Sequence, residues 1–504
     1  MNDESAARTS GHGASTGRKR SPVPRLGRSF LIPTLVLLAA TALAAATIPD
    51  PAAMDDETFE RELAARFQYG PPQPAPVEVT DRRDGQQVDA DYLARFPEFD
   101  RAYSPAARAE AARLVVRLRA EARDLDHEQF VLRVAEIAAL ADNAHTALGE
   151  NAFRKNTPRL PLRSYPFADG LYVLRARPAD ADLLGARIER IDGRPVAALR
   201  ERLRRYAGGT SAHRDGLLLP VLESPALLHA AGLAETPDAL TLAGVRADGS
   251  VFDRRIRAEP RNRSAPVSST ARLLFPADPD DPLPSFLGAG APRPASLRDA
   301  DHLFTTQALP DGGLYVGLAH NADADESPIR DFLAGVLARL RAEHPSFVVL
   351  DMRMNGGGDY TTTYAFARAL PAAAGGASVY VLTSGWTFSA AITTVAALKD
   401  AGGNRVTIVG EPVGDRLDFW AEGGSFVLPN AFLVVHYAAG RHNYGAPCTD
   451  RETCFWLNDR FPVRVTGLDP DIAAPMRFAD YRQGRDSALE AVLARHRRTV
   501  AGPR

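Results

Sequence analysis

The chain has 504 residues, a formal net charge of -2 at pH 7 and 24% charged residues. This length excludes a single small core and favours about three domains. The near-neutral charge argues against a protein that binds a polyanion, so no nucleic-acid partner is expected.

The N-terminus has the pattern of an export signal. Basic residues at 18–28 precede an apolar run over 30–46, which contains an Ala-x-Ala cleavage pattern. The run is close to the minimum of about 17 residues that spans a bilayer, so an uncleaved inner-membrane anchor is the alternative to a cleaved signal peptide. Both interpretations place the body of the protein outside the cytoplasm, either in the periplasm or attached to the membrane.

The first part of the mature chain is predicted to be a linker followed by helices. Residues 47–95 are rich in proline, alanine and acidic residues, which is typical of a linker. Apolar residues at helical spacing from Ser104 to Leu140 predict a helical hairpin or small bundle. The second helix ends in Asp-Asn-Ala-His-Thr at 142–146. A histidine at a helix end is by default a cap or a partner of the helix dipole.

A β-rich segment follows from about Leu160 to Ala258. Its pattern predicts a strand at 170–174, a strand with an Asp-Gly turn and a return at 184–196, a short helix at 198–206, and a hairpin within 240–256. Eight prolines between 260 and 300 exclude regular structure there and predict a linker or a long surface loop.

Three buried strands organise the C-terminal part of the chain. They are predicted at 347–350, 379–383 and 406–409, as apolar runs without alternation that helical stretches separate. A strand at 313–318 and a helix at 329–343 precede them. In such α/β sheets the chemistry lies where strands end and helices begin.

Two of these strand ends carry residues suited to catalysis. Glycines at 356–358 allow a sharp turn with uncovered N–H groups, which an oxyanion hole needs. Ser389 lies at the next strand-to-helix turn, where the helix N-terminus favours negative charge. A lone glycine run is more often a simple turn and a lone serine more often an N-cap. Their occurrence at successive strand ends favours a nucleophile beside an oxyanion hole.

These segments resemble a known family. The residues at 351–358, Thr-Phe-Ser-Ala-Ala at 387–391 and Val-Gly-Glu-Pro at 409–412 resemble the S41 peptidases, which include the C-terminal processing and tricorn-type core proteases. The resemblance covers most of the chain beyond Ser104. It implies a mixed α/β fold with an S41 ClpP/crotonase-like α/β catalytic core, a helical N-terminal segment and a PDZ-like β-rich domain. That domain either binds peptide tails or is only a spacer.

The resemblance also assigns roles to residues. Ser389 is the expected nucleophile, and the N–H groups of Gly356 or Gly357 and of Ala390 are the expected oxyanion donors. No metal and no organic cofactor are implied.

The base that activates the serine is the main question of mechanism. Processing proteases use a lysine after the Gly-Glu-Pro segment, but no lysine follows it here, and Arg416 cannot act as a base because it stays protonated. Lys399 lies ten residues along the helix, about 15 Å from Ser389. In S41 members without the lysine, a histidine in an Asp-x-x-His-Thr or Asp-Gly-His pattern is the base, so the resemblance favours His145.

Other partners remain open at this point. His436 and His442 compete with His145 as the base. The acid that orients the imidazole is one of four carboxylates: Asp142, Glu411, Asp415 and Asp469.

The two cysteines are predicted to pair. Cys448 and Cys454 lie six residues apart in a polar segment, and such a pair in an exported protein predicts a disulfide. A zinc site would need more Cys or His at ligand spacing, so no metal is expected.

The sequence as a whole predicts an exported serine endopeptidase of the S41 class that acts on peptides or proteins. The alternative is a catalytically inactive S41-like periplasmic binding or scaffold protein. The oligomeric state is left open. The expected parts are a signal peptide or anchor (1–46), a linker (47–95), a helical domain (96–158), a PDZ-like domain (159–259), a Pro-rich linker (260–300) and the catalytic domain (301–497).

Overall fold

A computed structural model describes residues 50–71, 77–260, 270–278, 281–299, 301–324 and 328–501. The signal peptide or anchor predicted at 1–46 lies outside these residues. Within the described ranges, no helix combines the length and the apolar character that crossing a bilayer requires.

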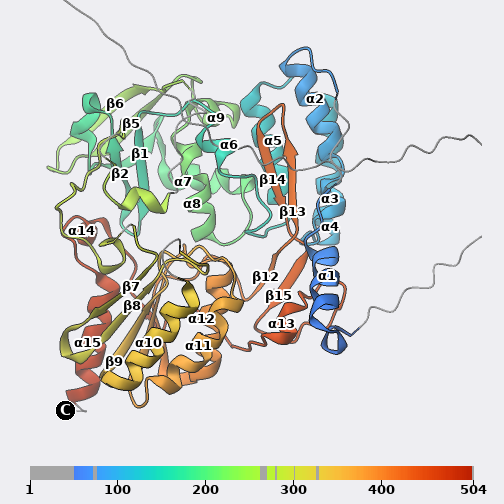
Figure 1. The fold of residues 1–504 in the computed structure, drawn as a ribbon. Helices are drawn as coiled ribbons and strands as arrows, with labels where there is room; N and C mark the ends of the chain where they lie inside the picture. The colour runs from blue at the N-terminus through green and yellow to red at the C-terminus, as the bar shows by residue number, and fades with distance from the viewer. Residues whose placement is uncertain are drawn as a thin grey trace, which may run out of the picture. The chain divides into compact units, whose positions relative to one another are not determined.

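The C-terminal part of the chain is built on a six-stranded sheet (Figure 1). Its strand order is β16-β11-β10-β9-β8-β7, and all neighbouring strands are parallel except β7 and β8. The strands are β7 (Phe304–Ala308), β8 (Leu314–Leu318), β9 (Phe347–Asp351), β10 (Ser378–Thr383), β11 (Val406–Gly410) and β16 (Ile472–Ala473). The buried strands predicted from apolar runs are confirmed, as is the mixed α/β class.

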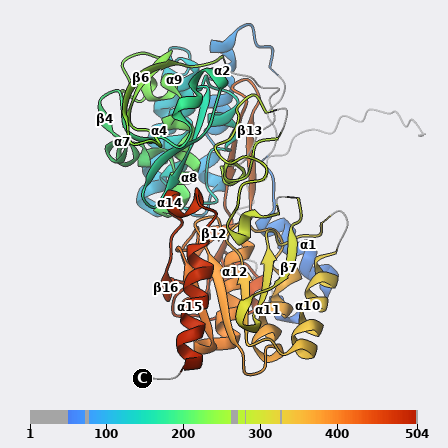
Figure 2. The ribbon, with the colours of Figure 1, turned by 90° about the vertical axis from the view of Figure 1, so that its left-hand side faces the viewer.

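Helices cover both faces of this sheet (Figures 1 and 2). Alternate residues of one strand face opposite cores: Val348 and Leu350 of β9 pack with the helices of one face, Phe347 and Val349 with the helix of the other. The first face carries α10 (Ile329–Glu343), α11 (Thr361–Ala373) and α12 (Ala390–Gly402), and the second carries α15 (Ser487–Ala501). The sheet is therefore the middle layer of an α/β/α sandwich, which explains its unbroken apolar strands.

The predicted helical segment is present. It contains α4 (Pro105–Glu121), α5 (His127–Ala139) and the short α6 (Asn151–Arg154). Ser104 caps α4 through its hydroxyl, and Asp126 forms a capping box with Gln129 at the start of α5. The helical hairpin is thus confirmed.

The β-rich segment forms a second sheet of six strands. The order is β1-β2-β3-β5-β6, and β4 pairs with β3. The strands are β1 (Leu162–Phe167), β2 (Gly170–Ala176), β3 (Arg187–Ile191), β4 (Arg194–Pro195), β5 (Ala239–Val245) and β6 (Val251–Arg257), with α7 (Val196–Leu203), α8 (Ser211–Leu222) and α9 (Pro225–Ala230) inserted between β4 and β5. The predicted Asp-Gly turn and the hairpin lie where the pattern placed them.

The linker predicted at 47–95 is wrong in its described part. Two helices occur there, α1 (Asp56–Phe67) and α2 (Arg82–Leu93), and the short α3 (Phe96–Phe99) follows. Asp55 and Asp81 cap the first two through side-chain oxygens. In addition, Phe59 and Phe67 of α1 are buried. Proline content does not predict the structure here, because the capping residues and the buried rings stabilise helices on either side of the prolines at 71–76.

The helical segment does not have a separate core. The hairpin of β13 (Gly424–Leu428) and β14 (Leu433–Tyr437) extends from the C-terminal part of the chain to α2 and α5 (Figure 1). Phe426 and Val435 of this hairpin share one buried core with Phe96 and Phe130. The helical segment and the C-terminal α/β segment are therefore interleaved, so a boundary drawn at one point along the chain does not separate them.

The Pro-rich stretch at 260–300 has only short 3₁₀ turns in its described part, at Ala271–Leu274 and Ala295–Leu297. It nevertheless packs against the body of the protein, since Leu274 and Leu297 are fully buried. Two further short α-helices in the described residues are α13 (Leu457–Arg460) and α14 (Phe478–Tyr481).

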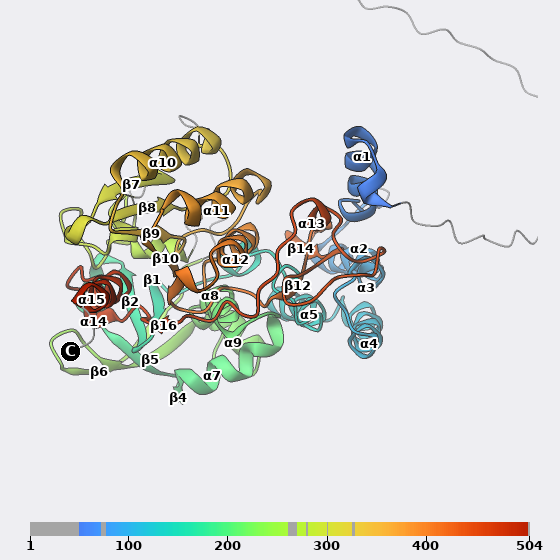
Figure 3. The ribbon, with the colours of Figure 1, turned by 90° about the horizontal axis from the view of Figure 1, so that it is seen from below.

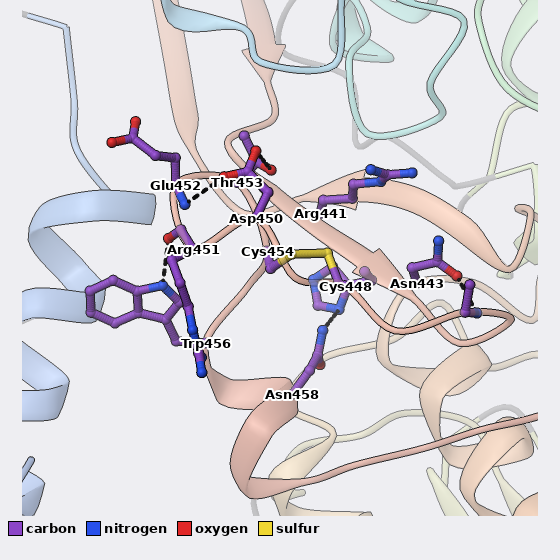
Figure 4. Close-up of a disulfide and its surroundings, with 12 residues drawn as sticks. Arg441, Asn443, Cys448, Asp450, Arg451, Glu452, Thr453, Cys454, Trp456 and Asn458 are labelled. Atoms are coloured by element: carbon purple, nitrogen blue, oxygen red, sulfur yellow. Dashed lines mark hydrogen bonds between the residues drawn. A yellow bond between two sulfur atoms is a disulfide. The ribbon is translucent and has the colours of Figure 1, made fainter. Parts of the chain in front are cut away.

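A second pair of strands and a disulfide complete the C-terminal part. β12 (Asp418–Ala421) pairs with β15 (Gly440–Asn443), and α13 follows beside α1 (Figure 3). Cys448 and Cys454 form a disulfide with their Cα atoms 5.6 Å apart. Figure 4 shows this bond at the edge of the polar loop that leads from β15 to Trp456.

Candidate active site

The glycine turn and the serine loop lie side by side because they follow neighbouring parallel strands, β9 and β10. Hydrogen bonds join the two loops directly. The Ser384 hydroxyl donates to the carbonyl oxygen of Arg353 at 2.6 Å, and the Thr387 hydroxyl donates to that of Met352 at 2.9 Å. The Phe388 N–H donates to the Asn355 carbonyl oxygen at 3.0 Å. The conformation of one loop therefore fixes that of the other.

Ser389 lies at the start of α12 in an unusual backbone conformation. Its φ is 54° and its ψ is -126°, a region that non-glycine residues rarely occupy. Such a conformation costs on the order of 1–3 kcal/mol and is concentrated at functional sites. Gly357, with φ 110°, packs against it so closely that an added Cβ would lie 2.7 Å from the Ser389 Cβ. Only glycine fits at that position.

The predicted oxyanion donors differ in their bonding. Among the described residues, no acceptor pairs with the N–H groups of Gly356 and Ala390. The Gly357 N–H, by contrast, donates to Oδ1 of Asn355 at 2.9 Å. Gly357 therefore shapes the turn, and Gly356 and Ala390 are the predicted donors that have free N–H groups.

His145 reaches this site from the loop after α5. Its ring stacks on Phe388, the residue before Ser389, with ring centroids 4.3 Å apart and an interplanar angle of 22°. It also stacks on Phe419 of β12 at 5.6 Å and 16°. Within the described part of the chain, neither ring nitrogen has a hydrogen-bond partner. Two phenyl rings thus hold the plane of the imidazole next to the serine loop.

One of the four open carboxylates faces His145. Oδ2 of Asp415 lies 3.7 Å from Nδ1 of His145, and the Asp415 side chain is 1% exposed. Asp142 instead binds two arginines, Glu411 accepts the Met476 N–H at 2.9 Å, and Asp469 is exposed. The structure therefore favours Asp415 as the acid beside the imidazole.

Arginines anchor the loop that carries His145. Asp142, which has a φ of 46°, binds Arg214 of α8 at 2.7 Å and Arg416 at 2.9 Å. Arg416 also donates to the Asp142 carbonyl oxygen at 2.7 Å. The residue that follows Asp415 thus holds the loop that carries His145.

A buried carboxylate supports the same loop from below. The Thr146 hydroxyl donates to Oδ2 of Asp100 at 2.6 Å, and the Ala438 N–H donates to the same oxygen at 3.2 Å. Burial raises the pKa of Asp100 to about 6, although these hydrogen bonds act in the opposite direction.

The competing bases are engaged elsewhere. Nδ1 of His436 lies 2.8 Å from the Ser425 hydroxyl across the β13–β14 pair. His442 is buried, stacks on Phe419, and contacts Tyr444 and Asn458 at 3.2 Å. The Lys399 ammonium donates to the Val406 carbonyl oxygen at 2.7 Å and lies 3.3 Å from Asp471, at the far end of α12.

Sequence reasoning missed His213 and Asn321. His213 of α8 stacks on Phe388 at 5.2 Å and 23°, and burial lowers its pKa to about 4. Nothing in the helical pattern around it marked it as part of the site. Asn321 follows β8 and lies behind the glycine turn. Its position just after a parallel strand was a signal that could have found it.

A cavity of about 600 Å³ opens beside the site. Trp386, Asp415 and Gly385 line it together with residues of α8. This volume is in the range of sites that bind small molecules and cofactors. Across the described ranges, no group of three or more His, Cys, Asp or Glu side chains is placed to hold a metal ion.

Comparison with known proteins identifies the fold. No protein-family model matches the sequence, and no curated protein matches it. Among solved structures, mature CPAF in complex with lactacystin is similar at a TM-score of 0.50 and 14% identity, over 83% of this chain and 98% of that one. The photosystem II D1 C-terminal processing protease is similar at a TM-score of 0.33 and 14% identity, over 81% and 99%. A Bacteroides fragilis protein assigned to the S41 proteases is similar at a TM-score of 0.28 and 13% identity, over 69% of this chain and 85% of that one. At this identity the likeness to mature CPAF concerns the fold alone, and it covers the helical, β-rich and α/β parts over 83% of the chain.

Proposed function

We propose that this chain, whose fold is S41-peptidase-like, is a serine endopeptidase with Ser389 as nucleophile, His145 as general base and Asp415 as orienting acid. The observation that carries the proposal is the strained Ser389 at the start of α12, packed on Gly357 beside free N–H groups, with the His145 ring stacked on the preceding residue. A backbone strain of this kind is retained where function requires it.

The reaction follows from these groups. Nε2 of His145 takes the proton of the Ser389 hydroxyl as Oγ attacks the peptide carbonyl carbon. The N–H groups of Gly356 and Ala390 stabilise the negative charge that develops on the carbonyl oxygen. His145 then returns the proton to the leaving amine as the C–N bond breaks. Water, activated by His145, hydrolyses the acyl-enzyme and releases the acid product.

Asp415 stabilises the imidazolium that forms during this cycle. Its buried carboxylate is 3.7 Å from Nδ1, longer than a hydrogen bond, and Oδ2 has no other partner in the described part of the chain. Catalytic hydrogen bonds are often long in the free enzyme and tighten when substrate binds.

The setting of the site fits an exported enzyme. The disulfide of Cys448 and Cys454 is typical of oxidising compartments, which supports export by the predicted signal at the N-terminus. Because the cavity of about 600 Å³ lies beside Asp415 and the serine loop, it is the proposed entry for a peptide chain. The β-rich region contributes α8 to its wall.

The rival function is an inactive binding or scaffold protein of the same fold. The unpaired ring nitrogens of His145 are the observation in its favour, since no hydrogen bond joins this ring to Ser389 among the described residues.

A cleavage assay separates the two. The exported domain is incubated with a mixture of synthetic peptides of varied sequence, and products are identified by mass spectrometry. Hydrolysis of internal peptide bonds that is lost in Ser389→Ala and in His145→Ala supports the peptidase. Absence of cleavage by the folded wild type, or cleavage that survives Ser389→Ala, would contradict it.

A further inference from the structure

We infer that Asn321 is a positioning residue of the oxyanion hole, because it joins the glycine turn to the first turn of α12 through a fully buried hydrogen-bond network. The inference rests on the proposed function, since it concerns the same reacting site. It assigns a role to a residue whose side-chain hydrogen bonds, within the described part of the chain, go to neither Ser389 nor His145.

On one side, Asn321 fixes the glycine turn. Its N–H donates to the Gly357 carbonyl oxygen at 2.8 Å, and its own carbonyl oxygen accepts the Asp359 N–H at 2.7 Å. Its side-chain Oδ1 accepts from Nδ2 of Asn355 at 2.8 Å, and Oδ1 of Asn355 accepts the Gly357 N–H at 2.9 Å. The backbone on both sides of Gly356 is therefore held from behind.

On the other side, Asn321 reaches the helix that follows the serine. Its Nδ2 donates to the Thr394 hydroxyl at 2.8 Å and to the Thr363 hydroxyl at 2.9 Å, and lies 3.4 Å from the Ala390 carbonyl oxygen. The Thr394 hydroxyl in turn donates to the Ala390 carbonyl oxygen at 2.9 Å. One carboxamide thus links the turn of Gly356 to the peptide unit next to the Ala390 N–H.

Burial makes this arrangement unique. Asn321, Asn355 and Thr363 are fully buried and Thr394 is 1% exposed. A buried amide that loses a partner costs about 1–3 kcal/mol, so the satisfied network strongly favours one geometry. Oxyanion donors act only when they are held close to the position of the developing charge. Asn321 sets the spacing of the two donors in Gly356 and Ala390 without touching the substrate.

The test compares three variants. Asn321→Asp keeps the side-chain shape but replaces the Nδ2 donor by an oxygen, and Thr394→Val removes one hydroxyl of the network and serves if Asn321→Asp does not fold. The matched control is Thr393→Val, because Thr393 is an equally buried neighbour on α12 whose hydroxyl bonds Tyr444 at 2.6 Å instead. For each, kcat, KM, the inhibition constant of a peptide aldehyde and the thermal midpoint are measured.

The expected result separates positioning from stability. Asn321→Asp lowers kcat by about 10- to 100-fold while KM changes little, and the aldehyde, which binds as a tetrahedral adduct, weakens in proportion. Thr394→Val shows a smaller effect of the same kind, and Thr393→Val keeps wild-type kcat even if its midpoint falls. If Asn321→Asp and Thr394→Val lose only as much kcat as Thr393→Val at similar midpoints, the inference is overturned.

A second readout does not depend on activity. In amide hydrogen exchange, the segments 355–359 and 389–391 are expected to exchange faster together in Asn321→Asp and Thr394→Val, but not in Thr393→Val. Faster exchange confined to one of the two segments would refute the coupling. A wild type that shows this coupling but cleaves no peptide would count against the proposed peptidase and not against the network.

Discussion

Nδ1 of His145 lies 3.7 Å from Oδ2 of Asp415, and these two residues are 270 positions apart in the chain. The contact depends on the interleaved fold, in which the loop after α5 packs on the segment that follows β11. Arg416 strengthens the contact by binding Asp142 at 2.9 Å. Because Arg416 follows Asp415 and Asp142 lies three residues before His145, this ion pair joins the segment of the acid to the loop of the base.

Asp415→Asn is expected to remove the charge without changing the shape of the side chain. The Arg416 N–H still has an acceptor, because it donates to Oδ1 of Asp415 at 2.9 Å. Loss of the carboxylate leaves the imidazolium unsupported, so kcat on a cleaved peptide falls by about 10²- to 10⁴-fold with little change in KM. Asp400→Asn, at the far end of α12 and paired with Arg368, is the control. An Asp415→Asn enzyme with wild-type kcat would exclude the assigned acid.

Gly357→Ala is expected to abolish activity. The new Cβ would lie 2.7 Å from the Ser389 Cβ and would occupy a φ of 110°, so the serine loop must move. Gly335→Ala is the matched control, since Gly335 is exposed within α10 with no atom near its Cβ position. That change should stabilise the protein by about 0.5–1 kcal/mol. Both effects are read from peptide hydrolysis and thermal unfolding, and an active Gly357→Ala enzyme would contradict the packing.

The stability of the protein should depend on the charge of His213. Burial lowers the pKa of this histidine to about 4, with Asp415 opposing the shift and His145 and Arg214 adding to it. Between about pH 6.5 and 4 the unfolded chain binds the proton and the folded chain does not, so stability falls as the pH falls. The upper limit is on the order of 3 kcal/mol. The free energy of unfolding of wild type minus that of His213→Gln should decrease from pH 7 to pH 4. A constant difference would argue against a buried neutral His213.

Asp100 should act in the opposite direction over nearly the same range. Burial raises the pKa of its carboxyl to about 6, so the folded chain holds a proton that the unfolded chain releases above about pH 4. Stability from this group is therefore present at low pH and lost as the pH rises to about 6. The free energy of unfolding of the wild type minus that of Asp100→Asn, measured by chemical denaturation, should decrease as the pH rises from about 4 to about 6. The two groups offset each other in the wild type, which is why each variant is needed.

Removing the disulfide should lower stability without removing the active site. A closed loop of this length is worth about 2 kcal/mol in the chain-entropy account. Cys448→Ser combined with Cys454→Ser is compared with wild type by denaturant unfolding, in the presence and absence of a dithiol reductant. The reductant should reduce the stability of the wild type only. An equal effect on both proteins would mean that the bond does not form.

The sequence predicted the C-terminal sheet well, because strands buried on both faces leave an apolar pattern without alternation. The ends of β9 and β10 followed from this, and with them the positions of the glycine turn and Ser389. The helices α1 and α2 were missed because prolines were given more weight than the capping residues Asp55 and Asp81.

Contacts between residues far apart in the chain determine the rest of the site, and the sequence could not predict them. Four carboxylates were equivalent by spacing, and only the packing of the His145 loop distinguishes Asp415 from the others. The stacking of Phe388 and Phe419 on His145 joins three distant segments, so no local pattern reveals it. The bond from Gly357 to Asn355 likewise required coordinates, and it moves the role of oxyanion donor toward Gly356.

Labelling with a serine-directed fluorophosphonate tests the central claim most directly. The wild-type protein and its His145→Ala and Lys399→Ala variants are treated with the probe, and the adduct is located by mass spectrometry. The account predicts an adduct on Ser389 that is lost in His145→Ala and kept in Lys399→Ala, whose ammonium is engaged at the far end of α12. A folded wild type without any adduct on Ser389, or labelling that persists in His145→Ala, would contradict the account.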